Sequence, residues 1–178
     1  LDLSSEIENA YGPDGLGVLL IHNVPDLKKF RETLLPYAQK FKNLPQSVRD
    51  SLVDSQSFFQ FGWSEGNEYL DKGKTKKDVY KAGFFANPLL DIPTVDPQEL
   101  IQYPGLCRPN IWPSEEILPG FKFAFLALTQ LIHSTSLLVA LQCDKYVKKK
   151  MELTEEQLNR YSLFEILSRS RCHKARLL

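Results

Sequence analysis

The sequence predicts an α+β fold that is predominantly helical. Several stretches carry apolar side chains at helical spacing, whereas only the short runs 17–21 and 171–178 have strand character. The composition is that of a globular chain, because 43% of the 178 residues are hydrophobic and 25% are charged. No internal repeat or flexible linker interrupts the chain, so we expect a single domain over residues 1–178.

The amino-terminal part is predicted to combine short helices with a strand. A Gly-Pro pair follows residues 5–11 and would end a short helix over this range. Residues 17–21 are apolar and lie between a glycine and a proline, which predicts a buried strand. Helical spacing follows over 27–42, with a kink at Pro36 because proline removes a backbone donor. A further helix is predicted over 45–52, where proline stands in the first turn.

The remaining part is predicted to contain the longest helix. Regular periodicity is lost over 58–119, and we expect an ordered but irregular wrap lying on the helices. A wide apolar stripe over 120–148 predicts a long helix that is buried on more than one side. A capping box then opens a helix over 154–168, with Tyr161 directed inward, and a strand is expected at 171–178. The stripe of the long helix consists of Phe121, Phe125, Leu128, Ile132 and Val139, broadened by Phe123, Leu131 and Leu138.

The charge balance argues against two classes of protein. The chain has 22 basic and 22 acidic residues, whereas nucleic-acid binders and membrane-surface proteins use a standing positive field. No unbroken apolar run approaches the roughly 20 residues that span a bilayer, and the first ten residues lack the pattern of a signal peptide. The cysteines are odd in number and far apart, which favours reduced thiols. We expect a soluble, cytoplasmic protein with no nucleic-acid or membrane partner.

The histidines do not have the spacing of an iron site. Such a site commonly takes two histidines and one carboxylate, two of them supplied by a His-x-Asp or His-x-Glu pair. None of the histidines has an acidic residue two positions later: Val24 follows His22, Thr135 follows His133, and Ala175 follows His173. We therefore predict no metal ligand in this sequence.

An aromatic segment supplies the best candidates for a binding site. Residues 58–64 read Phe-Phe-Gln-Phe-Gly-Trp-Ser. Ligand pockets are largely apolar with a few placed polar groups, which Phe61 and Trp63 together with Ser64 and Asn67 would supply. We assign these four residues as substrate-side candidates. Packing in the core is the alternative, and the pattern favours it over a pocket.

Several short motifs occur in an order that resembles a known family. They are, in sequence order, Tyr11–Val18, Phe61–Ser64, Phe85–Pro88, Asn110–Pro113 and Arg169–Leu178. The motifs are spread over nearly the whole chain. Together they resemble the amino-terminal region of the plant-type members of the isopenicillin N synthase-like 2-oxoglutarate/iron(II)-dependent oxygenases.

This resemblance implies that the chain carries scaffold and substrate-side structure. In the family, a double-stranded β-helix begins at the position of 171–178, and the metal-binding and catalytic residues lie further on, so the resemblance implies no catalytic residue in this sequence. The resemblance thus implies an incomplete domain, inactive alone, from a parent that oxidises a small organic substrate with iron(II) and 2-oxoglutarate. Unpaired strand edges and uncovered helix faces would then favour self-association.

Two other functions remain open. The helix over 120–148 could bind a partner protein through an exposed apolar face, which would make the chain a helical interaction module. Cys172 lies between Arg171 and His173 and could be an activated thiol. The thiol enzyme is the weaker alternative, because adjacent side chains on a strand point to opposite faces.

Overall fold

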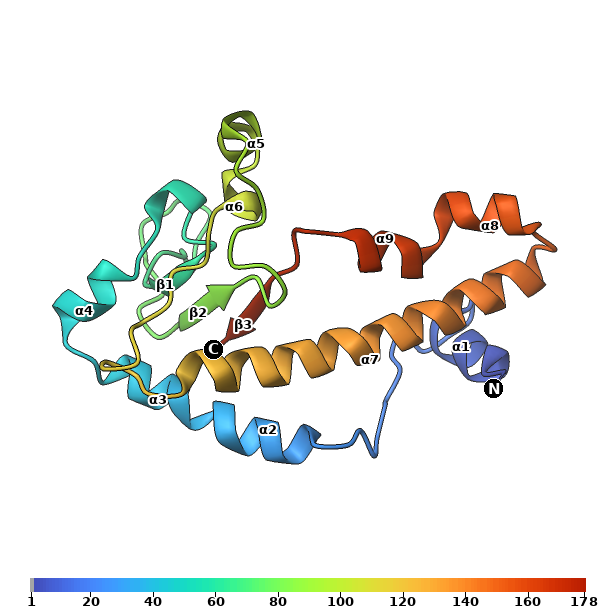
Figure 1. Cartoon of the computed structure of the whole chain (residues 1–178), viewed down its shortest axis with the longest axis horizontal. Coiled ribbons are helices and arrows are strands. Elements are labelled where there is room, and N and C mark those ends of the chain that lie inside the picture. Colours follow the sequence, from blue (N-terminus) through green and yellow to red (C-terminus); the bar gives the residue numbers. More distant parts are fainter. Residues whose placement is uncertain (1) are drawn as a thin grey trace. The chain divides into compact units, whose positions relative to one another are not determined.

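The computed structural model describes residues 2–178, and the chain forms two compact units. The helical unit comprises the chain up to Asp26 together with Leu131–Ser170, and the sheet unit comprises Leu27–Gln130 together with Arg171–Leu178. About half of the described residues are helical, and the strands form a small antiparallel sheet (Figure 1). The mixed, largely helical character that the sequence predicts is confirmed.

The sheet unit begins with three short helices. The predicted kink at Pro36 is a break between α2 (Leu27–Leu34) and α3 (Pro36–Lys42). Pro36 starts α3 because the first position of a helix needs no backbone donor. The predicted helix that follows is confirmed as α4 (Gln46–Ser51), with Pro45 at its amino-terminal cap.

The segment 58–119, which the sequence describes as irregular, contains regular structure. Its elements are β1 (Gly62–Glu65), β2 (Ala82–Ala86), α5 (Pro97–Gln102) and α6 (Pro104–Cys107), and a short 3-10 helix at Ser55–Ser57 precedes them. Most of the segment is irregular, as predicted, but the prediction misses these elements because four to six residues are too short to show a period.

The sheet joins segments that are far apart in the sequence. Its strand order is β1-β2-β3, with β3 at Ala175–Leu177, and both pairs are antiparallel. Trp63, Phe84 and Leu177 lie opposite one another across the strands. The predicted terminal strand is confirmed, and one of its edges is paired with β2.

Gly62 allows β1 to start against the preceding segment. Its φ is +71°, and a Cβ added there would lie 2.0 Å from the carbonyl oxygen of Leu52. The amide of Trp63 donates a hydrogen bond to the same oxygen at 2.8 Å. Backbone geometry therefore requires the glycine of the Phe61–Ser64 motif.

The long helix predicted over 120–148 is confirmed as α7 (Phe121–Lys150), and the two units divide it after Gln130. Among the described residues, α7 is the one helix that is long and apolar enough to cross a bilayer, since an 18-residue window has a mean hydropathy of 1.7. A core helix of a globular protein passes the same test. Length and composition alone thus do not assign α7 to either environment.

The apolar stripe of α7 is only partly covered. Its first turns are buried at Phe121, Phe125 and Leu128. The prediction of burial on more than one side is wrong for the rest of the stripe, because Ile132 is half exposed and Leu138 is 64% exposed. Phe123, which lies beside the buried turns, is also exposed. Parts of α7 in each unit therefore keep large apolar side chains in contact with solvent.

Aromatic side chains form the centre of the sheet unit. Phe41, Phe84, Phe121 and Phe125 are fully buried. The ring of Phe84 meets those of Phe121 and Phe125 edge to face, with centroids 4.9 and 5.5 Å apart. Edge-to-face contacts align the positive rim of one ring with the negative face of the other. The burial of these rings anchors β2 between α3 and the start of α7.

Two motifs that carry the family resemblance meet in one polar cluster. The Asn110 side chain donates to the Asn87 carbonyl oxygen at 2.8 Å and accepts from the Asn87 amide at 2.7 Å. The carboxylate of Asp91 accepts from Asn110, Trp112 and Lys122 at 3.0, 2.7 and 2.5 Å. These bonds hold the turn after β2 against the segment that leads into α7.

The helical unit combines short helices with the second part of α7. They are α1 (Ser4–Tyr11), α8 (Glu155–Tyr161) and α9 (Leu163–Arg169). The capping box at Thr154 is confirmed, but the helix predicted over 154–168 is broken at Ser162. Tyr161 is 69% exposed, so the prediction of an inward position is wrong.

Asp144 on α7 explains the break between α8 and α9. Its buried carboxylate accepts from the Ser162 hydroxyl at 2.7 Å and from the amides of Leu163 and Phe164 at 2.9 and 3.0 Å. These amides belong to the first turn of α9. Amides in the first turn of a helix have no hydrogen-bond acceptor within that helix. A side chain of α7 thus fixes the point at which α9 begins.

The strand predicted at 17–21 is absent. Residues 16–24 form no helix or strand, and Val18 and Leu20 are 64% and 84% exposed where burial was expected. No strand of residues 2–178 pairs with this run. The prediction fails because a strand needs a hydrogen-bonding neighbour, which an apolar sequence by itself does not supply.

Candidate functional site

A cavity of about 290 Å³ lies in the sheet unit beside Trp63. Residues of α3, of all three strands and of the loop before β2 line it: Ala38, Lys42, Trp63, Val79, Tyr80, Ala82, Gly83, Leu177 and Leu178. Most of these residues are apolar, with one cation among them. Such a lining suits the apolar body of a small organic molecule.

Trp63 is held rigidly in the wall of this cavity. Its ring stacks on Phe41 with centroids 4.7 Å apart and an interplanar angle of 4°. Its indole nitrogen donates to Glu65 at 3.3 Å. The side chain is only 4% exposed, so it offers an edge to the cavity while most of the ring belongs to the core.

Lys42, which lines the cavity, belongs to a group of charged side chains. The Lys42 ammonium group forms an ion pair with Glu65, and Nε of Arg49 lies 3.5 Å from the same carboxylate. The hydrogen bond from Lys42 lowers the pKa of Glu65, against the opposing effect of burial. Two cations share one carboxylate, so the local charge is positive and favours an anionic group on a ligand.

The substrate-side candidates occupy different places in the sheet unit. Trp63 lines the cavity, whereas Ser64 and Asn67 are half-buried and joined by a 3.1 Å hydrogen bond from the Asn67 amide. Phe61 is fully buried and does not line this cavity. Its ring lies under the Lys174 ammonium group, 4.5 Å from the centroid.

Comparison with known proteins identifies no relative. No protein-family model, no curated protein and no solved structure matches this chain. The candidate site is therefore characterised by its own geometry and chemistry.

Several residues of the cavity carry no signal in the sequence. Lys42 reaches it from a helix of ordinary charge pattern, and Leu177 reaches it from the last strand. Leu177 approaches Trp63 because β3 pairs with β2 in the same sheet, and Lys42 approaches it because α3 packs on Trp63 through Phe41. A strand pairing of this range is not encoded in local spacing, so sequence reasoning could find Trp63 alone.

The histidines occupy separate positions. His22 is exposed in the unpaired run, His133 lies on α7, and His173 precedes β3. Over residues 2–178, no group of three or more His, Cys, Asp or Glu side chains is arranged to hold a metal ion.

Proposed function

We propose that this chain is the amino-terminal scaffold and substrate-side portion of a 2-oxoglutarate/iron(II)-dependent oxygenase. Its metal ligands would be provided by sequence that follows Leu178. The proposal combines the family resemblance of five ordered motifs with one structural observation. That observation is that, within residues 2–178, one edge of β3 and the apolar run at 17–21 have no strand beside them.

The edge of β3 supports this proposal. In the order β1-β2-β3, β3 pairs with β2 through one edge, and no strand among residues 2–178 lies at its other edge. A row of unpaired amides and carbonyls is a template for a further strand. A β-helix that continued from this position would add such a strand.

The apolar run at 17–21 supports the proposal independently. Val18 and Leu20 are both more than half exposed, although their sequence has strand character. Exposure of alternating apolar side chains costs free energy of about 25 cal/mol per Å² relative to burial. Pairing with a strand of a larger sheet would remove that cost and satisfy the backbone.

The cavity beside Trp63 supplies the substrate-side part of the proposal. Its apolar lining and the positive charge of Lys42 and Arg49 fit a small organic molecule that carries an acidic group. In the parent enzyme, iron(II) would present open coordination positions to 2-oxoglutarate and oxygen. The role of this chain would be to bind and orient the substrate.

The test compares the present chain with a version that continues past Leu178. Both are supplied with iron(II), 2-oxoglutarate and oxygen, and succinate is measured. We expect succinate from the longer protein alone. Hydrogen exchange should also show new protection of the amides at 17–21 in the longer protein, because they gain partners there. Succinate from the present chain, or unprotected amides at 17–21 in the longer protein, would contradict the proposal.

The exposed positions of α7 favour a second function, that of a helical interaction module. Ile132 is half exposed and Leu138 is 64% exposed, so charged substitutions there should not disturb the core. Ile132→Glu with Leu138→Glu should abolish association of the chain with itself or a partner, as measured by sedimentation velocity, and leave the melting temperature unchanged. Association that survives both changes would exclude this surface. Phe125 is unsuitable for the test because it is fully buried.

A further inference from the structure

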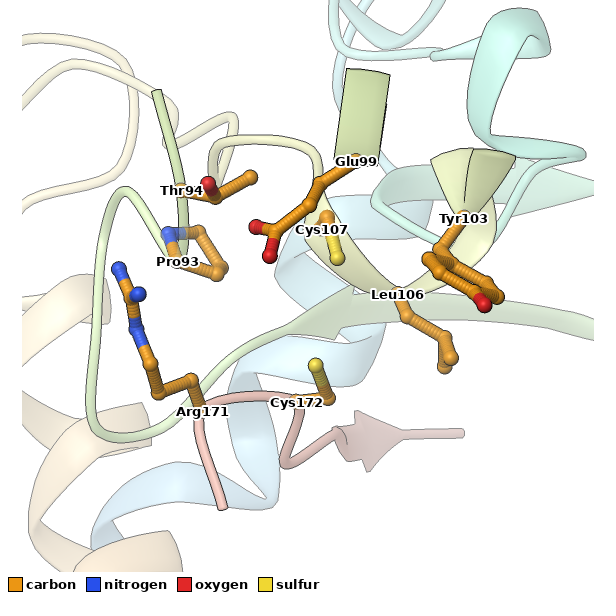
Figure 2. A pocket seen from close by; sticks show the side chains of 8 residues that line it. All are labelled: Pro93, Thr94, Glu99, Tyr103, Leu106, Cys107, Arg171 and Cys172. Atoms are coloured by element: carbon orange, nitrogen blue, oxygen red, sulfur yellow. The ribbon is translucent and has the colours of Figure 1, made fainter. Parts of the chain in front are cut away.

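A second cavity in the sheet unit contains two thiols. Its volume is about 330 Å³, and its lining includes Cys107 of α6 and Cys172 of the segment that leads into β3. Figure 2 shows the sulfur atoms of Cys107 and Cys172 directed toward each other across this cavity. The polar part of its wall also includes Thr94, Glu99, Tyr103 and Arg171.

We infer that Cys107 and Cys172 form a redox-sensitive pair that closes to a disulfide under an oxidant of the peroxide class. Neither residue takes part in a disulfide in the structure, and both lie in the same compact unit. A thiol–thiol contact between segments far apart in sequence differs from two isolated cysteines, because each thiol can resolve the oxidised form of the other.

The two thiols differ in their surroundings, which predicts different roles in the oxidation. Cys107 is 6% exposed, and burial, then the nearby Cys172, raise its pKa. Cys172 is only half-buried and is therefore more accessible to an oxidant than Cys107. Cys172 is thus the thiol that meets the oxidant, and Cys107 is the resolving thiol.

The reaction proceeds in two balanced steps. The Cys172 thiolate attacks one oxygen of hydrogen peroxide, the O–O bond breaks, and after protonation of the leaving hydroxide the products are a sulfenic acid and water. The Cys107 sulfur then attacks the Cys172 sulfur, forming the S–S bond and breaking the S–O bond. The Cys107 proton leaves with the departing hydroxide as a second water. Peroxide is reduced by two electrons, and the two thiols supply them.

The disulfide would fasten β3 to the rest of the sheet unit. It would tie the segment before Ala175 to α6 and close a loop of about 65 residues in the unfolded chain. Loop closure of this length, in a chain of this size, should raise the melting temperature by about 10 °C. Reduction should return the melting temperature to its starting value.

The test treats the purified full chain with hydrogen peroxide and maps its thiols by mass spectrometry without reduction. We expect a loss of about 2 Da and a cross-linked peptide pair that joins Cys107 to Cys172. The bond should be lost in Cys107→Ser and in Cys172→Ser. Cys143→Ser is the matched control and should keep it, because Cys143 lies on α7 in the helical unit.

The peptide map of the unsubstituted chain decides the outcome even if a variant does not fold. A sulfinic acid at Cys172 with Cys107 unmodified would overturn the inference. So would an unchanged mass, or a bond that involves Cys143 or joins two molecules.

Discussion

The run at 17–21 and strand β2 have contrasting sequences and opposite outcomes. The run contains Val18 and Ile21 on either side of two leucines and has high strand propensity, whereas three of the five residues of β2 are glycine or alanine, which have low propensity. Yet β2 is paired on both edges and buried, while the run is unpaired and exposed. Strand formation in this chain follows the availability of neighbours and not the local composition.

The physical reason lies in the backbone. Each residue carries a donor and an acceptor that must be satisfied when it is buried, and a strand can satisfy them only through another strand. β2 has β1 and β3 beside it and the ring of Phe84 in an aromatic core. The run at 17–21 has apolar side chains but no ladder, so it stays in solvent.

The largest expected effect is a truncation in β2. Phe84→Ala should lower the free energy of unfolding by about 3–5 kcal/mol, because it removes a fully buried ring from contacts with several others. The matched change in the unpaired run, Leu20→Ala, should alter it by no more than about 0.5 kcal/mol. Urea unfolding of both variants measures the difference. Equal effects would show that the run at 17–21 is buried in solution.

The next effect concerns the polar cluster at the end of β2. Asn110→Ala removes bonds to the amide and carbonyl of Asn87 and to Asp91, and should cost about 2–3 kcal/mol. Asn67→Ala is the control, because Asn67 makes a single hydrogen bond to Ser64 and should cost under about 1 kcal/mol. Thermal unfolding followed by circular dichroism distinguishes them. If Asn110→Ala leaves the thermal stability unchanged, the end of β2 is fixed by apolar packing alone.

The contrast also explains which features the sequence could predict. α7 and α4 were predictable because helical bonds join residues four apart, so periodicity carries the signal. The break at Ser162 depends on Asp144, eighteen residues earlier, and was not predictable from local spacing. For the cavity, the aromatic segment identifies Trp63, but Lys42 and Leu177 reach it through tertiary packing. The meeting of Cys107 with Cys172 has the same origin.

A smaller effect tests whether Asp144 stabilises the start of α9 in the helical unit. Asp144→Ala should cost about 1–2 kcal/mol, because the Ser162 hydroxyl and the first amides of α9 lose their acceptor. Asp144→Asn keeps one side-chain oxygen and should cost less. Hydrogen exchange at Leu163 and Phe164 should accelerate in proportion to the loss. Unchanged exchange would mean that α9 is stabilised by its own sequence and not by α7.

A pH-dependent effect reports on burial of the segment that enters β3. Burial lowers the pKa of Lys174 to about 8, from an ordinary value of 10.5, and the charge of Arg176 adds to the lowering. The unfolded chain therefore binds more protons than the folded chain between pH 8 and pH 10.5, so this group's contribution to stability becomes more favourable as the pH rises through that window. Relative to Lys174→Met, the unsubstituted protein should gain stability in urea unfolding from pH 7 to pH 10. Other groups titrate in both proteins and cancel in the difference. If the difference does not change with pH, Lys174 is solvated as fully as the run at 17–21, and the two segments no longer differ in burial.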